Sequence, residues 1–192
     1  FCGISKNQNP NLAVATARAG NVIGGGDWAK DRIIPDVIRA LLNSEEIIVR
    51  NSSAKRPWQH VLEPLSGYLL LAEKLFSSQH LILENLNNPY SSAFNFGPNL
   101  KSNRSVSELV EIILKQWPGS WIDKSNNNPF HEAGRLDLQV DKAFHNLNWS
   151  AKWSFETTVL RTVGWYQNVM NNNQMAYSEC LADIDKYTEN SS

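Results

Sequence analysis

A short apolar run that leads into a glycine-rich loop constrains the fold of this chain most. Residues 12–17 read Leu-Ala-Val-Ala-Thr-Ala and are apolar on both alternating faces. This pattern is typical of a strand buried on both sides of a parallel sheet. The run is followed by Gly24-Gly-Gly26, and consecutive glycines let another group approach the backbone closely or form a hinge.

Helical and extended patterns alternate through the rest of the chain. We predict strands over 47–49, 59–61, 93–97 and 135–140, and helices over 33–41, 63–76, 105–117, 141–147 and 154–170. In the helix at 63–76, one apolar stripe contains Leu65, Leu69, Ala72 and Phe76. The polar segment 77–92 is predicted to be a surface connection. This order favours an α/β architecture, with one domain over 1–171 and a loosely ordered tail over 172–192.

Composition excludes several classes of protein. With 192 residues, 42% of them hydrophobic, the chain has material for one domain or a large part of a bigger one. Its formal charge of −1 gives no whole-chain electrostatic basis for binding nucleic acid or an anionic membrane. The two distant cysteines support neither a metal cluster nor a disulfide framework and favour a reducing cytoplasm. The first residue is Phe, which suggests that the chain begins partway through something longer.

Three arginines are candidate anion ligands, because a guanidinium offers paired donors to phosphate oxygens. They are Arg32, Arg56 and Arg135, and each has the alternative of an exposed surface cation. Arg56 is the strongest candidate since Pro57 and Trp58 follow it directly. Asn21 comes after the predicted buried strand, at the end where open parallel sheets bind ligands. Its alternative is an asparagine that stabilises the turn.

Other polar and aromatic residues leave two interpretations open. His60 and His131 are candidate proton carriers, but neither has a nucleophile nearby in sequence, so a structural histidine is the safer interpretation. Asn95 either contacts a ligand or caps the turn that follows it. Trp28 and Trp58 either stack on a base or pack in the core.

These motifs, in this order, resemble the extended short-chain dehydrogenase/reductase family of nucleotide-sugar enzymes. The resemblance extends from about Leu12 to Tyr166 and is strongest in three segments: ARAGNVIGGGDW at 17–28, RIIPDVIRA at 32–40 and RPWQHVLEPLSGYLLLAEKL at 56–75. FNFGP at 94–98 also matches, and after Pro98 the resemblance is weaker, at HEA (131–133) and DKA (141–143). Within the family, the dehydratases that act on CDP-glucose are the most similar.

The resemblance implies a partial NAD(P)-binding Rossmann-like fold. The strand and loop at 12–30 would be its last Rossmann strand, followed by the small mixed substrate-binding subdomain. It implies that a CDP-sugar contacts Asn21, Arg32, Arg56, Asn95, His131 and Glu132. The backbone of Ala19 and Gly20 would run close to the nicotinamide of NAD. In the whole family enzyme, NAD oxidises the sugar at C4, water is lost across C5 and C6, and the hydride returns to C6.

The chain also departs from the family pattern. It has no G-x-x-G-x-x-G fingerprint and no Tyr-x-x-x-Lys pair, so we assign it no catalytic residue and expect no activity without an amino-terminal cofactor domain. Full-length relatives would form homodimers through that domain. Gln139 replaces a helix-capping Asp, a role that Asp141 would take over, and Asn148 stands where the family usually has Gly.

Three alternatives remain open at this stage. The first is a non-catalytic nucleotide-sugar-binding module, or one that complements a separately encoded half. The second is a related nucleotide-sugar epimerase. The third is a polypeptide without function, which would expose the flank of its buried strand as an apolar patch.

Overall fold

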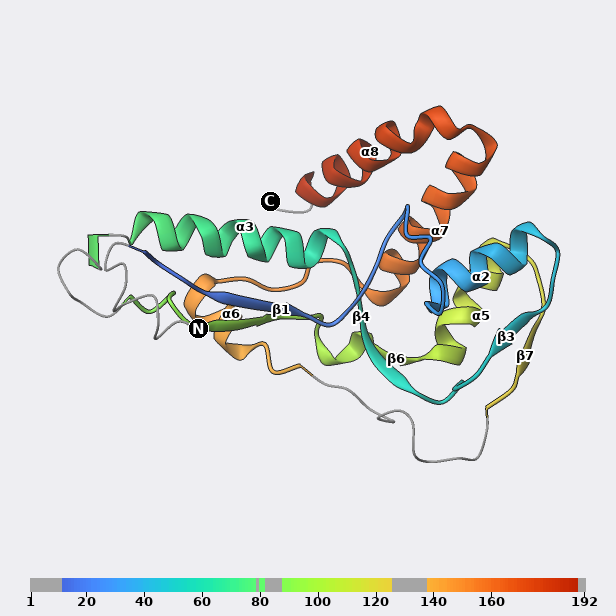
Figure 1. Cartoon of the computed structure of the whole chain (residues 1–192), viewed down its shortest axis with the longest axis horizontal. Coiled ribbons are helices and arrows are strands. Elements are labelled where there is room, and N and C mark those ends of the chain that lie inside the picture. Colours follow the sequence, from blue (N-terminus) through green and yellow to red (C-terminus); the bar gives the residue numbers. More distant parts are fainter. Residues whose placement is uncertain (1–11, 79, 82–87, 126–137, 190–192) are drawn as a thin grey trace.

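The computed structural model describes residues 12–78, 80–81, 88–125 and 138–189. Its strands are β1 (Thr16–Ala19), β2 (Asn21–Ile23), β3 (Ile47–Val49), β4 (Lys55–His60), β5 (Ala93–Phe96), β6 (Asn103–Ser105) and β7 (Trp121–Asp123). The α-helices are α2 (Ile33–Leu42), α3 (Leu62–Ser77), α5 (Val106–Gln116), α6 (Asp141–Leu147), α7 (Phe155–Asn171) and α8 (Ala176–Glu189) (Figure 1). The described residues also form two short 3-10 helices, η1 (Leu100–Ser102) and η2 (Asn173–Met175).

The strands form three small sheets. β1 pairs with β5 in parallel, β2 pairs with β4 in parallel, and β3 pairs with β7 in parallel. β6 joins the other edge of β4 in antiparallel orientation. The chain passes from the first sheet to the second at Gly20, between β1 and β2. A Cβ there would lie 3.0 Å from the carbonyl oxygen of Pro57, so glycine allows this close crossing.

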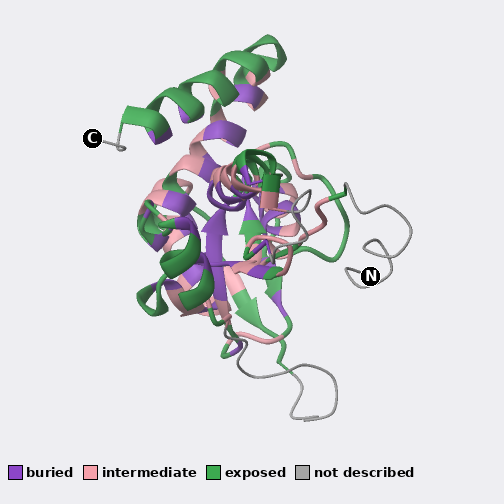
Figure 2. Cartoon of the chain, turned by 90° about the vertical axis from the view of Figure 1, so that its left-hand side faces the viewer, coloured by how far each residue is buried: buried purple, intermediate pink, exposed green. Residues whose placement is uncertain are grey.

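Two apolar cores hold these sheets and helices together. The larger core joins α2, β3, α5 and α7, and its fully buried side chains include Val37, Ile38, Ile113 and Tyr166. The smaller core lies between α3, β5 and α6 and contains Leu71, Phe94 and Phe96. Figure 2 shows the buried residues gathered in the middle of the molecule, whereas α8 is largely exposed.

Local sequence signals explain where the helices begin. Ser105 and Glu108 form the predicted capping box of α5, in which each side chain accepts a hydrogen bond from the other residue's backbone N–H. The Ser154 side chain accepts a hydrogen bond from the backbone of Thr157 at the start of α7, also as predicted. Helix α2, strand β3 and strand β5 lie where the sequence predicts them.

The helix predicted over 63–76 is α3; its apolar stripe is exposed, and the helix buries Glu63, Pro64, Gly67 and Leu71. Three local expectations are wrong. β1 begins at Thr16 rather than at 12, and most of it is exposed, while among the described residues only β5 pairs with it. Residues 138–140 form no strand, while 135–137 lie outside the described residues. Asp141 makes no capping hydrogen bond, since Val140 occupies the N-cap of α6.

Two features lie toward the carboxyl end of the chain: the C-cap of α6 and helix α8. Asn148 has φ 53° at the C-cap of α6, a left-handed conformation that glycine adopts most easily and asparagine tolerates. The glycine that the resemblance implies for the family at this position would suit the same conformation. Residues 176–189, expected in the loosely ordered tail, form helix α8 with Asp183 and Tyr187 buried. The division of the chain at 171 stays a prediction.

Candidate functional site

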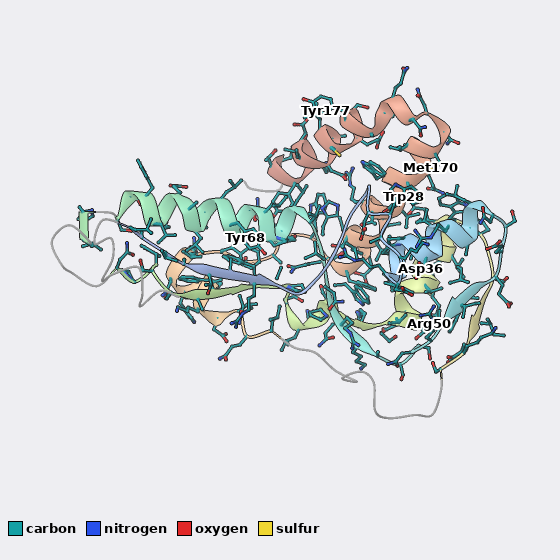
Figure 3. The ribbon with its side chains drawn as sticks, in the orientation of Figure 1. Trp28, Asp36, Arg50, Tyr68, Met170 and Tyr177 are labelled. Atoms are coloured by element: carbon teal, nitrogen blue, oxygen red, sulfur yellow. The ribbon has the colours of Figure 1, made fainter. Side chains whose placement is uncertain are left out.

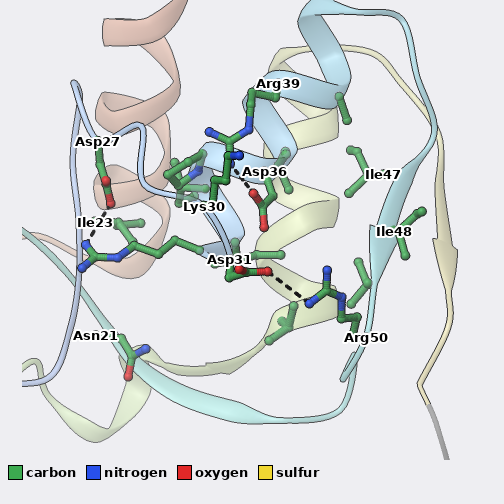
Figure 4. A pocket seen from close by; sticks show the side chains of 18 of the residues that line it. Asn21, Ile23, Asp27, Lys30, Asp31, Asp36, Arg39, Ile47, Ile48 and Arg50 are labelled. Atoms are coloured by element: carbon green, nitrogen blue, oxygen red, sulfur yellow. Dashed lines mark hydrogen bonds and ion pairs between the residues drawn. The ribbon is translucent and has the colours of Figure 1, made fainter.

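A cavity of about 1060 Å3 lies along β2, which follows the carboxyl end of β1 (Figure 4). Residues 19–24 form one wall, the start of α2 forms another, and the segment from β3 into β4 forms the third. Its volume is at the upper end of the range for ligand pockets. The site therefore lies where the chain crosses from one parallel strand pair to the next.

Five of the predicted site residues line this single cavity. They are Ala19, Gly20, Asn21, Arg32 and Arg56. Asn21 lies opposite Trp58 in the parallel β2–β4 register, so Arg56 is two residues from the position that faces Asn21. The Arg56 guanidinium donates to the carbonyl oxygen of Lys55 at 2.9 Å. The structure thus brings the predicted asparagine and both predicted arginines into one cleft.

The charges of the cavity wall are closely balanced. Lys30 and four arginines face it together with Asp27, Asp31, Asp36, Glu45 and Glu46. Arg32 Nη1 lies 3.1 Å from Asp27 Oδ2, and Arg50 Nη1 lies 3.3 Å from Asp31 Oδ1. Arg39 pairs with Asp36 and also donates to the carbonyl oxygen of Trp28. In this state, carboxylates occupy guanidinium positions that an anionic ligand would use.

The start of α2 adds to the anion-binding character of the cavity. Arg32 is the N-cap residue of α2, and its side chain makes no capping hydrogen bond. The first turn of a helix leaves backbone N–H groups without intrahelical partners, and the helix dipole favours negative charge there. Arg32 and the amino-terminal end of α2 therefore both favour a bound anion, while the negative charge of Asp27 offsets part of their positive charge.

The glycine loop is held by the chain's own aromatic residues. A Cβ on Gly25 would lie 2.1 Å from Cδ2 of Trp165. The group that lies close to the backbone of Gly25 is therefore the indole ring of Trp165 on α7. The Tyr166 hydroxyl donates to the carbonyl oxygen of Asp27 at 2.6 Å. Burial and the nearby Asp27 carboxylate raise the pKa of Tyr166 to about 12, which keeps this donor protonated. The glycines thus let the loop pack against the aromatic side chains of α7, and this packing fixes the position of the loop.

The two tryptophans of the motifs have packing roles. Trp58 is buried, and its Nε1 donates to the carbonyl oxygen of Arg104 at 3.0 Å. Trp28 is partly exposed and makes an edge contact with Tyr166, with ring centroids 5.2 Å apart. Figure 3 shows Trp28, Asp36 and Arg50 at the same end of the molecule.

The remaining predicted ligands are not brought to this cavity. Asn95 lies on β5 outside its lining, and its Nδ2 donates to the carbonyl oxygen of Gln139 at 3.1 Å. His131, Glu132 and Arg135 lie outside the described residues. The roles predicted for Asn95, His131 and Glu132 stay predictions.

Sequence reasoning missed several charged residues of the cavity wall, namely Lys30, Asp31, Asp36, Arg39 and Arg50. For Arg50, the sequence itself offered a signal for a ligand-binding residue. It directly follows the predicted strand at 47–49, as Asn21 follows β1, and ligands gather at the carboxyl ends of parallel strands. Asp31 had no comparable signal, because its left-handed φ of 61° becomes visible only in the structure.

A second polar cluster lies outside the cavity and anchors α8. The Glu63 carboxylate accepts hydrogen bonds from the backbone N–H groups of Lys152 and Trp153 and from the Tyr187 hydroxyl, the last at 2.7 Å. His60 Nε2 lies 3.8 Å from Asp183 Oδ2, and Arg161 Nη1 lies 3.4 Å from the other oxygen of that carboxylate.

Burial governs the ionisation of this second cluster. Burial and, to a lesser extent, the positive charge of Arg161 together lower the pKa of His60 to about 4. Burial raises the pKa of Asp183 to about 6 against the opposing effect of Arg161. It also raises the pKa of Glu63, although the hydrogen bonds from Trp153, Tyr187 and Lys152 oppose that rise. His60 is accordingly a neutral, structural residue, as the safer interpretation of the sequence holds.

The residues present do not make an NAD site by themselves. The backbone of Ala19 and Gly20 lines the cavity, but a Cβ at Gly20 would meet Pro57 and Leu138, so the chain's own atoms fill one side of it. The sequence has no glycine fingerprint that would hold a dinucleotide's phosphates. In the described part of the chain, no group of three or more potential metal ligands occurs. No described helix combines the length and apolar character needed to cross a bilayer.

Comparison with known proteins gives a consistent result. No protein-family model matches the chain. The chain is 40% identical over 169 residues to CDP-glucose 4,6-dehydratase of Salmonella typhimurium, a match that covers 87% of this chain and 45% of that enzyme. The chain thus spans about half the length of its relative.

Solved structures share the fold at low sequence identity. The dTDP-glucose 4,6-dehydratase of Bacillus anthracis in complex with NAD has a TM-score of 0.66 and 18% identity, over 93% of this chain and 50% of that chain. The UDP-glucose-4-epimerase of Stenotrophomonas maltophila with bound NAD has a TM-score of 0.70 and 14% identity, over 88% and 52%. The chain therefore has the fold of about half of a short-chain dehydrogenase/reductase of the dehydratase and epimerase type, and it is a homologue of CDP-glucose 4,6-dehydratase.

Proposed function

We propose that this chain is the nucleotide-sugar-binding part of a CDP-glucose 4,6-dehydratase. The observation that carries the proposal is the shared cavity of Asn21, Arg32 and Arg56, next to the crossing from β1 to β2. Its volume of about 1060 Å3 suits a nucleoside diphosphate with an attached hexose. The match to the Salmonella enzyme favours CDP-glucose among such ligands.

Binding would proceed by exchange of charge partners. The guanidinium groups of Arg32 and Arg56 would donate paired hydrogen bonds to the diphosphate. Arg32 would leave Asp27, whose Oδ2 lies 3.1 Å from Nη1 of Arg32. The Asn21 amide, which both donates and accepts, would contact the sugar and the diphosphate. Asn95, His131 and Glu132 would complete the nucleotide pocket.

The whole reaction requires more than this chain. It is the NAD-dependent loss of water from CDP-glucose, which gives CDP-4-keto-6-deoxyglucose. The fingerprint for NAD phosphates and the Tyr-x-x-x-Lys pair are absent from the sequence, so the cofactor half must come from elsewhere. The chain would contribute the substrate walls and the Ala19–Gly20 backbone that borders the nicotinamide. We expect this to take place in the cytoplasm.

A non-catalytic nucleotide-sugar-binding protein is the second candidate function. The cavity favours it, because Asn21, Arg32 and Arg56 line it together and could bind a CDP-sugar without the redox half. The two candidates predict the same ligand and differ only in whether a cofactor half restores turnover.

Calorimetric titration of the purified chain with CDP, UDP and dTDP tests the proposal. We expect CDP to bind most tightly, and equal affinity for all three would contradict the cytidine assignment. A spectrophotometric assay with CDP-glucose and NAD should show no turnover by the chain alone. Turnover would refute the assignment of catalysis to a separate half.

A further inference from the structure

The glycine loop at 24–26 packs against two side chains, Trp165 on α7 and His60 at the end of β4. A Cβ on Gly25 would lie 2.1 Å from Cδ2 of Trp165, and a Cβ on Gly24 would lie 3.8 Å from Nε2 of His60. Gly24 also lines the cavity. A movement of either ring would therefore change the position of a loop that forms part of the cavity wall.

Helix α8 contacts both of these side chains. The Nε1–H of Trp165 donates to Sγ of Cys180 at 3.4 Å. The backbone N–H of Leu62 donates to Nδ1 of His60 at 3.4 Å, so the proton of the neutral imidazole is on Nε2. That Nε2 lies 3.8 Å from Oδ2 of Asp183. Helix α8 thus presents a sulfur to one of the two rings and a carboxylate to the N–H of the other.

The attachment of α8 depends mainly on polar groups. Of its 14 residues, Asp183 and Tyr187 are buried, and the others are exposed or half-buried. Arg161 Nη1 lies 3.4 Å from Oδ1 of Asp183, and the Tyr187 hydroxyl donates to Glu63 at 2.7 Å. Elements with few buried apolar contacts open at a low cost in free energy. Helix α8 can therefore detach while the rest of the fold stays intact.

The connection between α7 and α8 has the character of a hinge. Residues 171–175 are all exposed. Asn172 ends α7 with φ −154° and ψ 103°, outside the helical region. From this turn, α8 folds back toward the start of α3 (Figure 1). Hinges are short segments of this kind, in which a few residues absorb the change in backbone angles.

We propose that α8 is a reversible clamp on the glycine loop. In the docked state, α8 holds Trp165 and His60 in place and so keeps the loop in the position that binds ligand. In the undocked state, both side chains lose their partners on α8, and a ligand must order the loop as it binds, which lowers affinity. Because coupling is reciprocal, a bound ligand strengthens the docking of α8 by the same factor. The choice of a CDP-sugar as ligand rests on the proposed function, whereas the clamp does not.

Two substitutions release α8 by different means. Asp183→Ala removes the carboxylate that lies beside His60 and Arg161. Asp185→Pro breaks the helix at an exposed position but keeps every side chain that attaches α8, because proline lacks the N–H and clashes with the preceding turn. Asp185→Ala is the matched control. In calorimetry, each releasing variant should bind CDP at least about fivefold more weakly, and the control should bind it like the parent.

Hydrogen–deuterium exchange followed by mass spectrometry measures docking itself. In the parent, saturating CDP should slow exchange of the α8 amides at 176–189, a response that a helix with a merely stabilising role would not show. Without ligand, both releasing variants should speed exchange at residues 22–28 at least about fivefold, and Asp185→Ala should leave it unchanged. Thermal melts followed by circular dichroism check that the variants fold.

Three results would overturn the clamp: parent-like CDP affinity in both releasing variants, α8 exchange that bound CDP leaves unchanged, and an equal loss of affinity in Asp185→Ala. If a releasing variant does not fold, the response of α8 to CDP in the parent decides. If the parent binds no CDP, the proposed function fails and exchange at residues 22–28 decides the clamp. Faster exchange there in the releasing variants would support the clamp, and unchanged exchange would contradict it.

Discussion

The hydroxyl of Tyr166 on α7 donates a 2.6 Å hydrogen bond to the carbonyl oxygen of Asp27, in the loop that borders the cavity. The ring of Tyr166 is fully buried in the larger core. The position of Asp27, and through it the ion pair with Arg32, therefore depends on core packing more than 130 residues away in sequence.

Tyr166→Phe should destabilise the fold and weaken nucleotide binding together. Removing the hydroxyl leaves a carbonyl oxygen without its donor, which costs about 1–3 kcal/mol. The midpoint of urea unfolding should fall accordingly, and CDP affinity should fall severalfold. Tyr177→Phe is the control because Tyr177 is 75% exposed on α8. Equal stability of the two variants would show that the hydrogen bond does not hold the loop.

Gly25→Ala should be strongly destabilising because the added methyl overlaps the Trp165 ring, 2.1 Å from Cδ2. Overpacking of this kind costs about 1–3 kcal/mol. Gly164→Ala provides a matched comparison, since its Cβ meets only Gln116 at 3.5 Å inside helix α7. Alanine is favoured over glycine in a helix, so this variant should melt at or above the parent temperature. Similar losses in both variants would contradict the packing role of the glycine loop.

Asp27→Asn should increase affinity for CDP. The substitution removes the charge that pairs with Arg32 at 3.1 Å, while the amide oxygen can still accept from the backbone N–H of Ala29. The diphosphate then no longer competes with a carboxylate, and we expect a severalfold gain that shrinks at high salt. Calorimetry at two salt concentrations measures it. Weaker binding at both would show that Asp27 contacts the ligand instead of competing with it.

Asp183 makes stability fall as pH rises. Its pKa increases from 3.8 unfolded to about 6 in the fold, so the folded state holds a proton that the unfolded state has lost. The corresponding stability is present below pH 4 and disappears by about pH 6. His60 acts in the opposite direction, because its pKa falls from 6.5 to about 4 and the fold loses stability as pH drops through that interval.

Asp183→Asn should therefore steepen the rise of stability with pH between 4 and 6.5. The free energy of unfolding of the parent minus that of the variant should decrease with pH, by at most about 3 kcal/mol. Urea unfolding at several pH values measures this difference. Asp185→Asn, on the exposed side of the same helix, removes the same kind of charge from α8 and serves as the matched comparison. A difference that increases with pH for Asp183→Asn would refute the assignment.

Local sequence signals predict much of this fold because they act within a few residues. The capping box at Ser105 and the N-cap at Ser154 fix two helix starts in the manner expected. The place of Asn21, just after the carboxyl end of β1, follows from the rule that parallel strands present ligand residues at that end, whereas Arg56 lies near the amino end of β4 and Arg32 at the start of α2. That rule also applies to Arg50, which we did not select.

The failures arise where long-range packing decides the outcome. Apolar residues of β1 and of the α3 stripe have the pattern of core residues, but no described element covers them. The glycine loop has the pattern of a ligand-binding turn, yet Trp165 occupies the space next to Gly25. Asp141 has a good capping side chain, but the helix begins one residue too early for it to act.

Calorimetric titration of CDP into variants of the cavity tests the central claim most directly. Asn21→Ala and Arg56→Ala should each weaken binding about tenfold to a hundredfold, the effect of losing a hydrogen bond to a charged group. Lys115→Ala, an exposed cation on α5 away from the cavity lining, should bind CDP like the parent. Unchanged affinity in both cavity variants, or an equal loss in Lys115→Ala, would contradict the assignment of this cavity as the nucleotide-sugar site.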